Sequence, residues 1–263
     1  MCTSSLDPAQ DAGALAAPAA DRGAPGPAAD PALIADLVIA NHILVREGVL
    51  DAFGHVSVRH DKRPDRFLLA RNMAPALVQA QDIVEFGDDG EPVNAHGRPV
   101  YLERYIHSEI YRARPDVMSV VHSHSMSVIP FGIVPSVPFR AVTHMGSFIG
   151  VCAPVFEIRD VAGEDNDLLI SNRALGAALA RRLGGEAVCL MRGHGSTAVG
   201  DSLKQAVFRA VYTEQNARVL SEASRLGPVV ALSPGETKTA TRTIDTQVPR
   251  AWDVWRMKAE GKI

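Results

Sequence analysis

The sequence predicts a single α/β domain built around an antiparallel sheet. Its 263 residues, of which 46% are hydrophobic and 22% charged, are enough for one large domain with a substantial core. Stretches with helical periodicity are interspersed with short runs of alternating or apolar residues, which indicate strands. Several such runs follow one another before residue 122, and this succession favours antiparallel pairing.

A tail is expected to precede the domain. Residues 1–30 are dominated by Ala, Pro, Gly and Asp, and they contain no large apolar residue after Leu15. Such a segment buries too little surface to offset the entropy lost on ordering. Residues 1–30 are therefore predicted to be disordered, and residues 31–263 to form the folded domain.

Four stretches carry the helical pattern, each with a residue that can end it. The expected helices run from Pro31 to near Gly48, from Glu103 to Arg114, from Ser171 or Asn172 to Gly184, and from Asp201 to Gly227. Expected strands or apolar strand-like segments lie at 55–59, 67–70, 82–86, 117–124, 150–154 and 187–191. In the first strand, Val56 and Val58 face one way, and the polar residues that alternate with them could line a pocket.

Composition limits the possible partners. The formal net charge is −3, without a run of Lys or Arg, so nothing predicts binding to nucleic acid or to an anionic membrane. No stretch approaches the ~18 consecutive apolar residues of a membrane span, and the start lacks a secretory signal pattern. We therefore expect a cytoplasmic protein with a small-molecule partner.

Three histidines and one glutamate indicate a possible metal site. His122 and His124 are two residues apart in an expected strand, so their imidazoles project to the same side. His194 lies between Gly193 and Gly195, which permit a sharp turn and close approach. Together with Glu103, these residues would suit Zn²⁺ or another divalent first-row ion. The alternative is that the histidines are only polar residues at strand ends, and spacing alone leaves both readings open.

The order of these motifs resembles the class II aldolase and adducin family. The resemblance covers about residues 33–226 and rests on Glu103, a helix, Arg114-Pro115-Asp116, Val121-His122-Ser123-His124 and Arg192-Gly193-His194-Gly195. It implies a three-layer α/β/α sandwich around a mostly antiparallel sheet, and a homotetramer with active sites between neighbouring subunits. It also implies one divalent metal ion per subunit on His122, His124 and His194, with Glu103 as a further ligand and a proton-transfer residue.

Departures from the family pattern bear on the substrate. The family's phosphosugar aldolases carry a pair of serines before the catalytic glutamate, where this chain has Tyr101-Leu102. The loss of two hydroxyls argues against a sugar phosphate. The neighbouring segments, residues 55–59 and 71–75, resemble the family's decarboxylase branch, which acts on hydroxylated aromatic or pyridine carboxylates and on ring-cleavage semialdehydes.

The resemblance leads to a residue-level hypothesis for metal-dependent decarboxylation. The metal would be Zn²⁺ or Mn²⁺, with Co²⁺ or Fe²⁺ as further possibilities. Glu103 is expected to donate or relay a proton, with His144 and Tyr212 as further candidates. The residues expected to bind the carboxylate substrate are His55, Ser57, Arg71 and Asn72.

Other functions remain open on the same fold. They are an aldolase or sugar-acid phosphate decarboxylase, an iron-dependent oxygenase, and an adducin-like binding protein without catalysis. For the individual substrate residues a structural role is also open. Arg71 could pair with a surface acid, Ser57 could cap a turn, and Tyr212 could be a packing residue, while His107 is expected to be structural.

Overall fold

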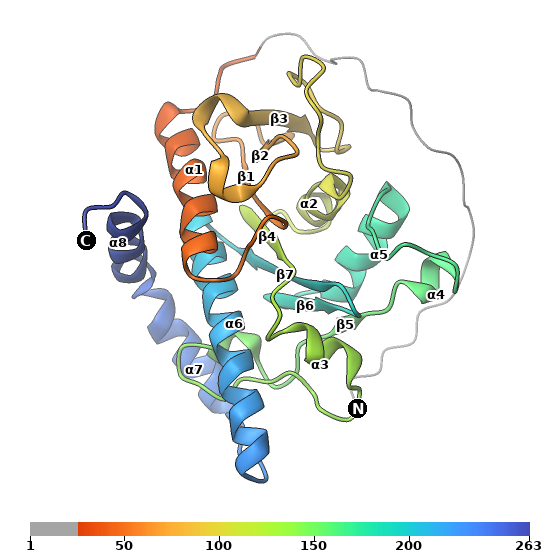
Figure 1. The fold of residues 1–263 in the computed structure, drawn as a ribbon, viewed down its shortest axis with the longest axis vertical. Helices are drawn as coiled ribbons and strands as arrows, with labels where there is room; N and C mark the ends of the chain where they lie inside the picture. The colour runs from red at the N-terminus through yellow and green to blue at the C-terminus, as the bar shows by residue number, and fades with distance from the viewer. Residues whose placement is uncertain (1–25) are drawn as a thin grey trace.

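A central seven-stranded sheet organises the molecule, a computed structural model that describes residues 26–263 (Figure 1). The strands are β1 (His55–Arg59), β2 (Arg66–Ala70), β3 (Ile83–Gly87), β4 (Ser119–Ser123), β5 (Val155–Phe156), β6 (Val188–Met191) and β7 (Gly195–Gly200). Their order across the sheet is β3-β2-β1-β4-β7-β6-β5. All neighbours pair antiparallel except β5 and β6, which are parallel.

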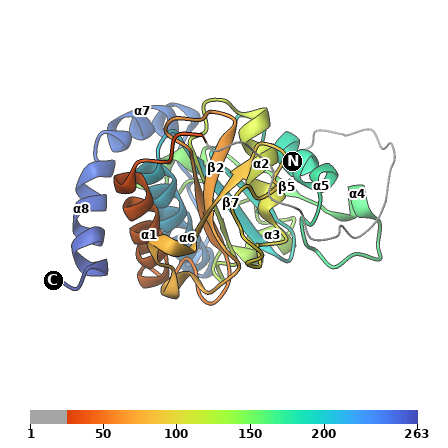
Figure 2. The same ribbon diagram turned by 90° about the horizontal axis from the view of Figure 1, so that it is seen from above.

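Helices cover both faces of the sheet, which gives the predicted three layers (Figure 2). On one side lie α1 (Pro31–Arg46) and α6 (Leu203–Leu226), and on the other α2 (Arg104–Ala113) and α5 (Arg173–Leu183). The short helices are α3 (Ile129–Ile133), α4 (Arg159–Ala162), η1 (Pro75–Leu77), η2 (Ala80–Asp82) and η3 (Ser147–Ile149). The predicted α/β/α sandwich is confirmed.

Local signals in the sequence explain where the main helices begin and end. Asp30 accepts a hydrogen bond from the backbone of Ala32 at the start of α1, and Asn172 and Ser202 cap α5 and α6 in the same way. At the other end, Gly184 terminates α5 and Gly227 terminates α6. Helix α1 begins at Pro31, as predicted, whereas residues 1–25 of the expected tail lie outside the described residues.

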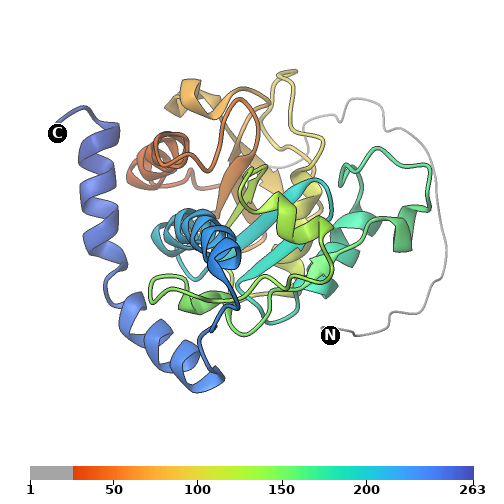
Figure 3. The same ribbon diagram turned by 60° about the horizontal axis from the view of Figure 1, so that its bottom comes forward.

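The C-terminal segment forms an additional layer. It consists of α7 (Pro234–Asp245), which packs against the segment containing η3, and α8 (Val248–Ala259), which lies outside α1 and α6 (Figure 3). Trp252 and Trp255 of α8 are buried, and Trp255 contacts the rings of Phe208 and Tyr212 on α6. An ion pair of 2.7 Å between Arg256 and Asp36 joins α8 to α1. This C-terminal segment therefore packs on its own chain.

The first strand departs from the prediction in one respect. Val56 and Val58 are buried, as expected, but two of the three polar residues on the other face of β1, His55 and Ser57, are buried as well. His55 and Ser57 are 3% and 0% exposed, because α2 covers them and supplies polar side chains that bond to them. No helix of residues 26–263 combines the length and apolar character that a membrane crossing requires.

Close packing of α2 against α5 generates a stability prediction. A Cβ placed on Gly176 of α5 would overlap the carbonyl oxygen of Tyr105 on α2. In a helix interior, alanine is normally more stabilising than glycine by about 1 kcal/mol. Gly176→Ala is instead expected to lower the free energy of unfolding by about 1–3 kcal/mol, measured by urea denaturation, because the helices must separate. Gly185→Ala is the control, since nothing lies within 4 Å of that added Cβ; equal stability of the two variants would contradict the packing argument.

Candidate metal centre and surrounding site

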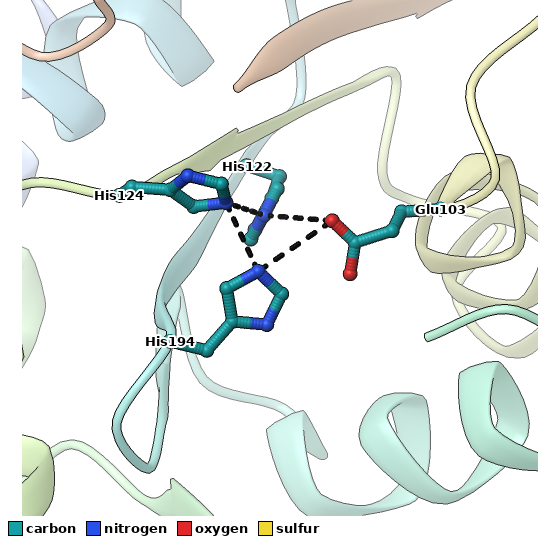
Figure 4. Close-up of side chains that lie close together, drawn as sticks. All are labelled: Glu103, His122, His124 and His194. Carbon is teal, nitrogen blue, oxygen red and sulfur yellow. Dashed lines mark hydrogen bonds and ion pairs between the residues drawn. The ribbon is translucent and has the colours of Figure 1, made fainter. Parts of the chain in front are cut away.

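Four side chains from three parts of the fold converge beside the sheet (Figure 4). His122 belongs to β4, and His124 follows that strand directly. His194 comes from the turn between β6 and β7, and Glu103 occupies the N-cap position of α2. One ligand atom from each of these residues lies within 4.8 Å of the others. The structure therefore brings together all four residues that were predicted to bind a metal.

The ligand atoms face a common centre. Nε2 of His124 lies 3.0 Å from Nε2 of His122 and 2.9 Å from Nε2 of His194. Oε2 of Glu103 lies 3.4 Å from Nε2 of His122 and 3.5 Å from that of His194. Bonds of about 2.0–2.1 Å to a tetrahedral Zn²⁺ would separate ligand atoms by about 3.3 Å. The observed separations bracket this value.

The protonation state required for metal binding is favoured at His122. Its Nδ1 lies 3.2 Å from the carbonyl oxygen of Ser196, which can only accept a hydrogen bond. Nδ1 must therefore carry the proton, so that Nε2 presents its lone pair to the centre. Burial, followed by the neighbouring His122, lowers the pKa of His194 to about 4, and the same two causes lower that of His124. Neutral imidazoles of this kind are suited to hold a divalent cation.

The Glu103 carboxylate has two distinct oxygens. Oε1 accepts a hydrogen bond of 3.0 Å from the backbone N–H of Ile170, whereas Oε2 faces the histidines. Burial raises the pKa of Glu103, but His122, His194 and the Ile170 N–H outweigh it and lower the pKa to about 2. The carboxylate is thus ionised at neutral pH, and its inward oxygen is available to a metal or a proton.

Gly193 and Gly195 place His194 as predicted from the sequence. Gly193 adopts a positive φ of 68°, which glycine tolerates and other residues rarely do. A Cβ on Gly195 would overlap the carbonyl oxygen of Ser123, so only glycine lets β7 approach β4 this closely. Close approach of the two strands carries His194 to the end of β4, beside His124.

Of the predicted substrate residues, His55 and Ser57 lie next to the cluster but beneath α2. The ring of His55 is 5.1 Å from that of His122, measured between centroids. The Ser57 hydroxyl is 2.6 Å from Nδ1 of His107 and 2.7 Å from the Tyr111 hydroxyl, and its side chain is fully buried. Ser57 is therefore engaged by protein groups and does not line an open site.

Arg71 and Asn72 lie in a loop connected to the site through Tyr101. The Tyr101 hydroxyl donates to the Met73 carbonyl at 2.5 Å, and the Tyr101 ring lies 4.6 Å from that of His55. Nε of Arg71 donates to Asp82 at 2.8 Å, and 31% of its side chain is exposed. Asn72 is exposed. Both residues remain predicted carboxylate-binding groups.

The predicted catalytic grouping of Glu103 with His144 and Tyr212 is not observed within one chain. His144 and Tyr212 instead line a cavity of about 600 Å³ together with Trp255 and other residues of α6–α8, and none of the four cluster residues lines it. The reason is topological, because Tyr212 belongs to α6, which covers the opposite face of the sheet from α2. Helical periodicity identified this helix without indicating which face it would cover.

One contact that supports the His122–His124 segment was not predicted from the sequence. The hydroxyl of Ser125, one residue after His124, donates to the carboxylate of Glu214 on α6, and both side chains are buried. Arg218 donates to the same carboxylate at 2.6 Å. This arrangement anchors the end of the His122–His124 segment. The only signal in the sequence was Glu214 itself, an acidic residue within an otherwise apolar helical stripe.

Loss of this anchor should be measurable. Glu214→Ala leaves a buried hydroxyl without its acceptor, and we expect the free energy of unfolding to fall by about 1–3 kcal/mol in urea denaturation. Glu222→Ala is the matched control on the same helix, because its ion pair with Arg225 is exposed, and it should change stability by less than about 0.5 kcal/mol. A similar effect of the two substitutions would show that the Ser125 contact contributes nothing.

Comparison with known proteins identifies the fold and the family. The family model for the class II aldolase and adducin N-terminal domain matches residues 35–221. Decarboxylase tropJ of Talaromyces stipitatus is 40% identical over 242 residues, which cover 83% of this chain and 91% of that protein. The 3,4-dihydroxyphthalate decarboxylase of Terrabacter sp. is 30% identical over 224 residues, covering 82% of this chain and 90% of that enzyme. An L-fuculose 1-phosphate aldolase from Glaciozyma antarctica has the same fold, with a TM-score of 0.71 at 21% identity over 88% of this chain and 90% of its own. The chain therefore belongs to the class II aldolase and adducin family, and its relatives place it on the decarboxylase branch, among carbon–carbon lyases.

Proposed function

We propose that the protein is a metal-dependent decarboxylase of a hydroxylated aromatic or pyridine carboxylate or dicarboxylate, or of a ring-cleavage semialdehyde. The observation that carries the proposal is the convergence of Glu103, His122, His124 and His194 in a chain 40% identical to a decarboxylase. Zn²⁺ or Mn²⁺ is the expected ion, with Co²⁺ or Fe²⁺ also compatible with three imidazoles and a carboxylate. A bound divalent ion would act as a Lewis acid on a substrate oxygen.

Side chains around the cluster favour a ring over a phosphorylated sugar. Leu102, beside Glu103, is 59% exposed, and Met126, two residues after His124, is 81% exposed. Phe53 is 65% exposed, and its ring stacks on His124 at 6.3 Å between centroids. Phe53 thus borders the cluster, Leu102 and Met126 are close to cluster residues in the sequence, and these apolar groups would contact a flat, weakly polar ring. The hydroxyl pair expected to hold phosphate in the family's aldolases is replaced by Tyr101 and Leu102.

Glu103 is the proposed proton relay. Decarboxylation breaks the bond between the ring carbon and the carboxylate, and the electron pair moves onto the conjugated oxygen while CO₂ leaves. Ionised Glu103 can take the proton of the substrate hydroxyl on Oε2 when that hydroxyl reaches the cluster. It can then deliver the proton to the ring carbon that carries the carboxylate, which turns the oxygen into a conjugated carbonyl that accepts the electron pair when CO₂ leaves. The hydrogen bond from Ile170 to Oε1 keeps Oε2 directed at the centre.

The outer residues are assigned to substrate binding and assembly. The exposed part of the Arg71 guanidinium, with Asn72, would bind a second carboxylate, since only its Nε is engaged by Asp82. His144 is exposed, and with Tyr212 it lines an apolar cavity away from its own cluster, so we propose that these two residues act at the site of a neighbouring subunit. A homotetramer in the cytoplasm is part of the same proposal.

The test combines metal content with product analysis. Purified protein is expected to hold about one divalent ion per chain and to release CO₂ from ortho-hydroxy aromatic or pyridine carboxylates, or from a muconate semialdehyde. EDTA should abolish the activity, and one of the four divalent ions should restore it. His122→Ala should lose metal and at least about 100-fold in kcat/KM, because it removes a ligand. His42→Ala is the control, since the ring of His42 hydrogen-bonds the Val78 carbonyl and His42 is not part of the cluster.

Other outcomes would overturn the proposal and identify an alternative. Turnover of phosphorylated sugars alone would indicate an aldolase or sugar-acid phosphate decarboxylase. Consumption of O₂ with Fe²⁺ and no CO₂ release would indicate an oxygenase. Protein without metal or turnover would indicate an adducin-like binding function.

A further inference from the structure

A buried chain of hydrogen bonds connects the metal cluster with the interior of the α2 face. Nδ1 of His55 lies 2.7 Å from Nε2 of His107, and Nδ1 of His107 lies 2.6 Å from Oγ of Ser57. The Ser57 Oγ in turn lies 2.7 Å from the hydroxyl of Tyr111. All four side chains are buried, with exposed fractions between 0% and 3%. The chain begins at His55, whose ring lies beside His122, and ends at Tyr111.

Each hydrogen bond in this chain contains one proton, so its direction can run only two ways. His107 uses both ring nitrogens, and burial, followed by His122, lowers its pKa to about 3. A neutral imidazole donates from one nitrogen and accepts at the other. The direction of every bond is therefore coupled to that of its neighbours, from Tyr111 to His55.

The end of the chain at Tyr111 selects the direction. Among residues 26–263, the Tyr111 hydroxyl has Ser57 as its side-chain partner and no other hydrogen-bond acceptor. If Ser57 donated to Tyr111, the phenol proton would be buried without an acceptor, which is costly. If Tyr111 donates to Ser57, then Ser57 donates to His107, and Nε2 of His107 donates to His55. Every buried proton then has an acceptor.

We propose that Tyr111, Ser57 and His107 are positioning residues that fix His55 as the tautomer protonated on Nε2. Nδ1 of His55 is occupied by the bond from His107, so Nε2–H is the donor that remains. The ring lies 5.1 Å from that of His122 and 4.6 Å from that of Tyr101, and its side chain keeps 3% of its surface exposed. The ring as a whole therefore lies beside the cluster.

The consequence deepens the proposed function and rests on it. A fixed N–H donor beside the cluster would bind an oxygen of the substrate, either the hydroxyl oxygen as it gains charge or the carboxylate. The opposite tautomer would direct a lone pair at the same oxygen and repel it. The Ser57 hydroxyl is thus required to orient the His55 ring, although Ser57 itself does not contact the substrate.

The experiment reads the tautomer directly, independently of any reaction. Zn²⁺-loaded protein labelled with ¹⁵N-histidine is examined by solid-state NMR, and the His55 signals are assigned by their loss in His55→Gln. We expect a protonated Nε2 and an unprotonated Nδ1 for His55, and the same for His107. Ser57→Thr retains the hydroxyl and Ser57→Val is its isosteric partner without one, so the two variants carry equal steric change.

The variants separate positioning from simple packing. Ser57→Thr should keep the His55 tautomer and, in the decarboxylation assay, stay within about threefold of the parent in kcat/KM. Ser57→Val should give a mixture of tautomers and at least a tenfold loss in kcat/KM, with metal content unchanged. Tyr105→Phe is the control, because it removes a phenol on the same helix that bonds Glu91 and Arg104 instead of the chain.

A His55 protonated on Nδ1 in the parent would overturn the inference, as would identical tautomers in the Thr and Val variants. Failure of the proposed function is a distinguishable result. Suppose that no carboxylate is turned over, but the His55 tautomer is as expected and changes only in Ser57→Val. The assignment of the positioning residues then holds, and the decarboxylase proposal fails.

Discussion

The convergence of three imidazole nitrogens on one point is the constraint on which the site depends. Nitrogen lone pairs that lie 2.9–3.0 Å apart repel one another unless a cation or a shared proton lies among them. The fold maintains this arrangement through the pairing of β4 with β7, which holds His122 opposite Thr197. Gly195 permits the close approach of these strands, and the Ser196 carbonyl fixes the orientation of His122. Glu103, at the start of α2, adds the negative charge that balances a bound cation.

Both faces of the sheet contribute to this constraint, in different ways. On the α2 face, buried polar side chains bond to one another in the chain from His55 to Tyr111. On the α6 face, the buried carboxylate of Glu214 holds Ser125 and so the segment that carries His124. The four residues proposed to bind the metal are thus supported by contacts on both faces of the sheet, as outer groups support the ligands in known metal centres.

Much of the fold and the cluster could be predicted because the relevant signals are local. Periodicity and capping residues predicted α1 and α5, and spacing in a strand predicted that His122 and His124 would share a side. The strand β7 was not predicted, because its Gly, Ser and Thr residues carry little apolar alternation and its pairing with β4 is a tertiary effect. The partners of Ser57 and the face occupied by Tyr212 could not be predicted either, since both depend on which helix covers which side of the sheet. His107 was expected to be structural, and its contacts show how such a residue connects to the site.

The most direct test of the central claim is to locate the metal. Crystals of the protein with its bound ion would be measured on both sides of the metal's X-ray absorption edge, and an anomalous difference map calculated. We predict one strong peak per chain, within bonding distance of the Nε2 atoms of His122, His124 and His194 and next to Oε2 of Glu103. A map without a peak among these four residues, or with the ion bound elsewhere in the chain, would contradict it.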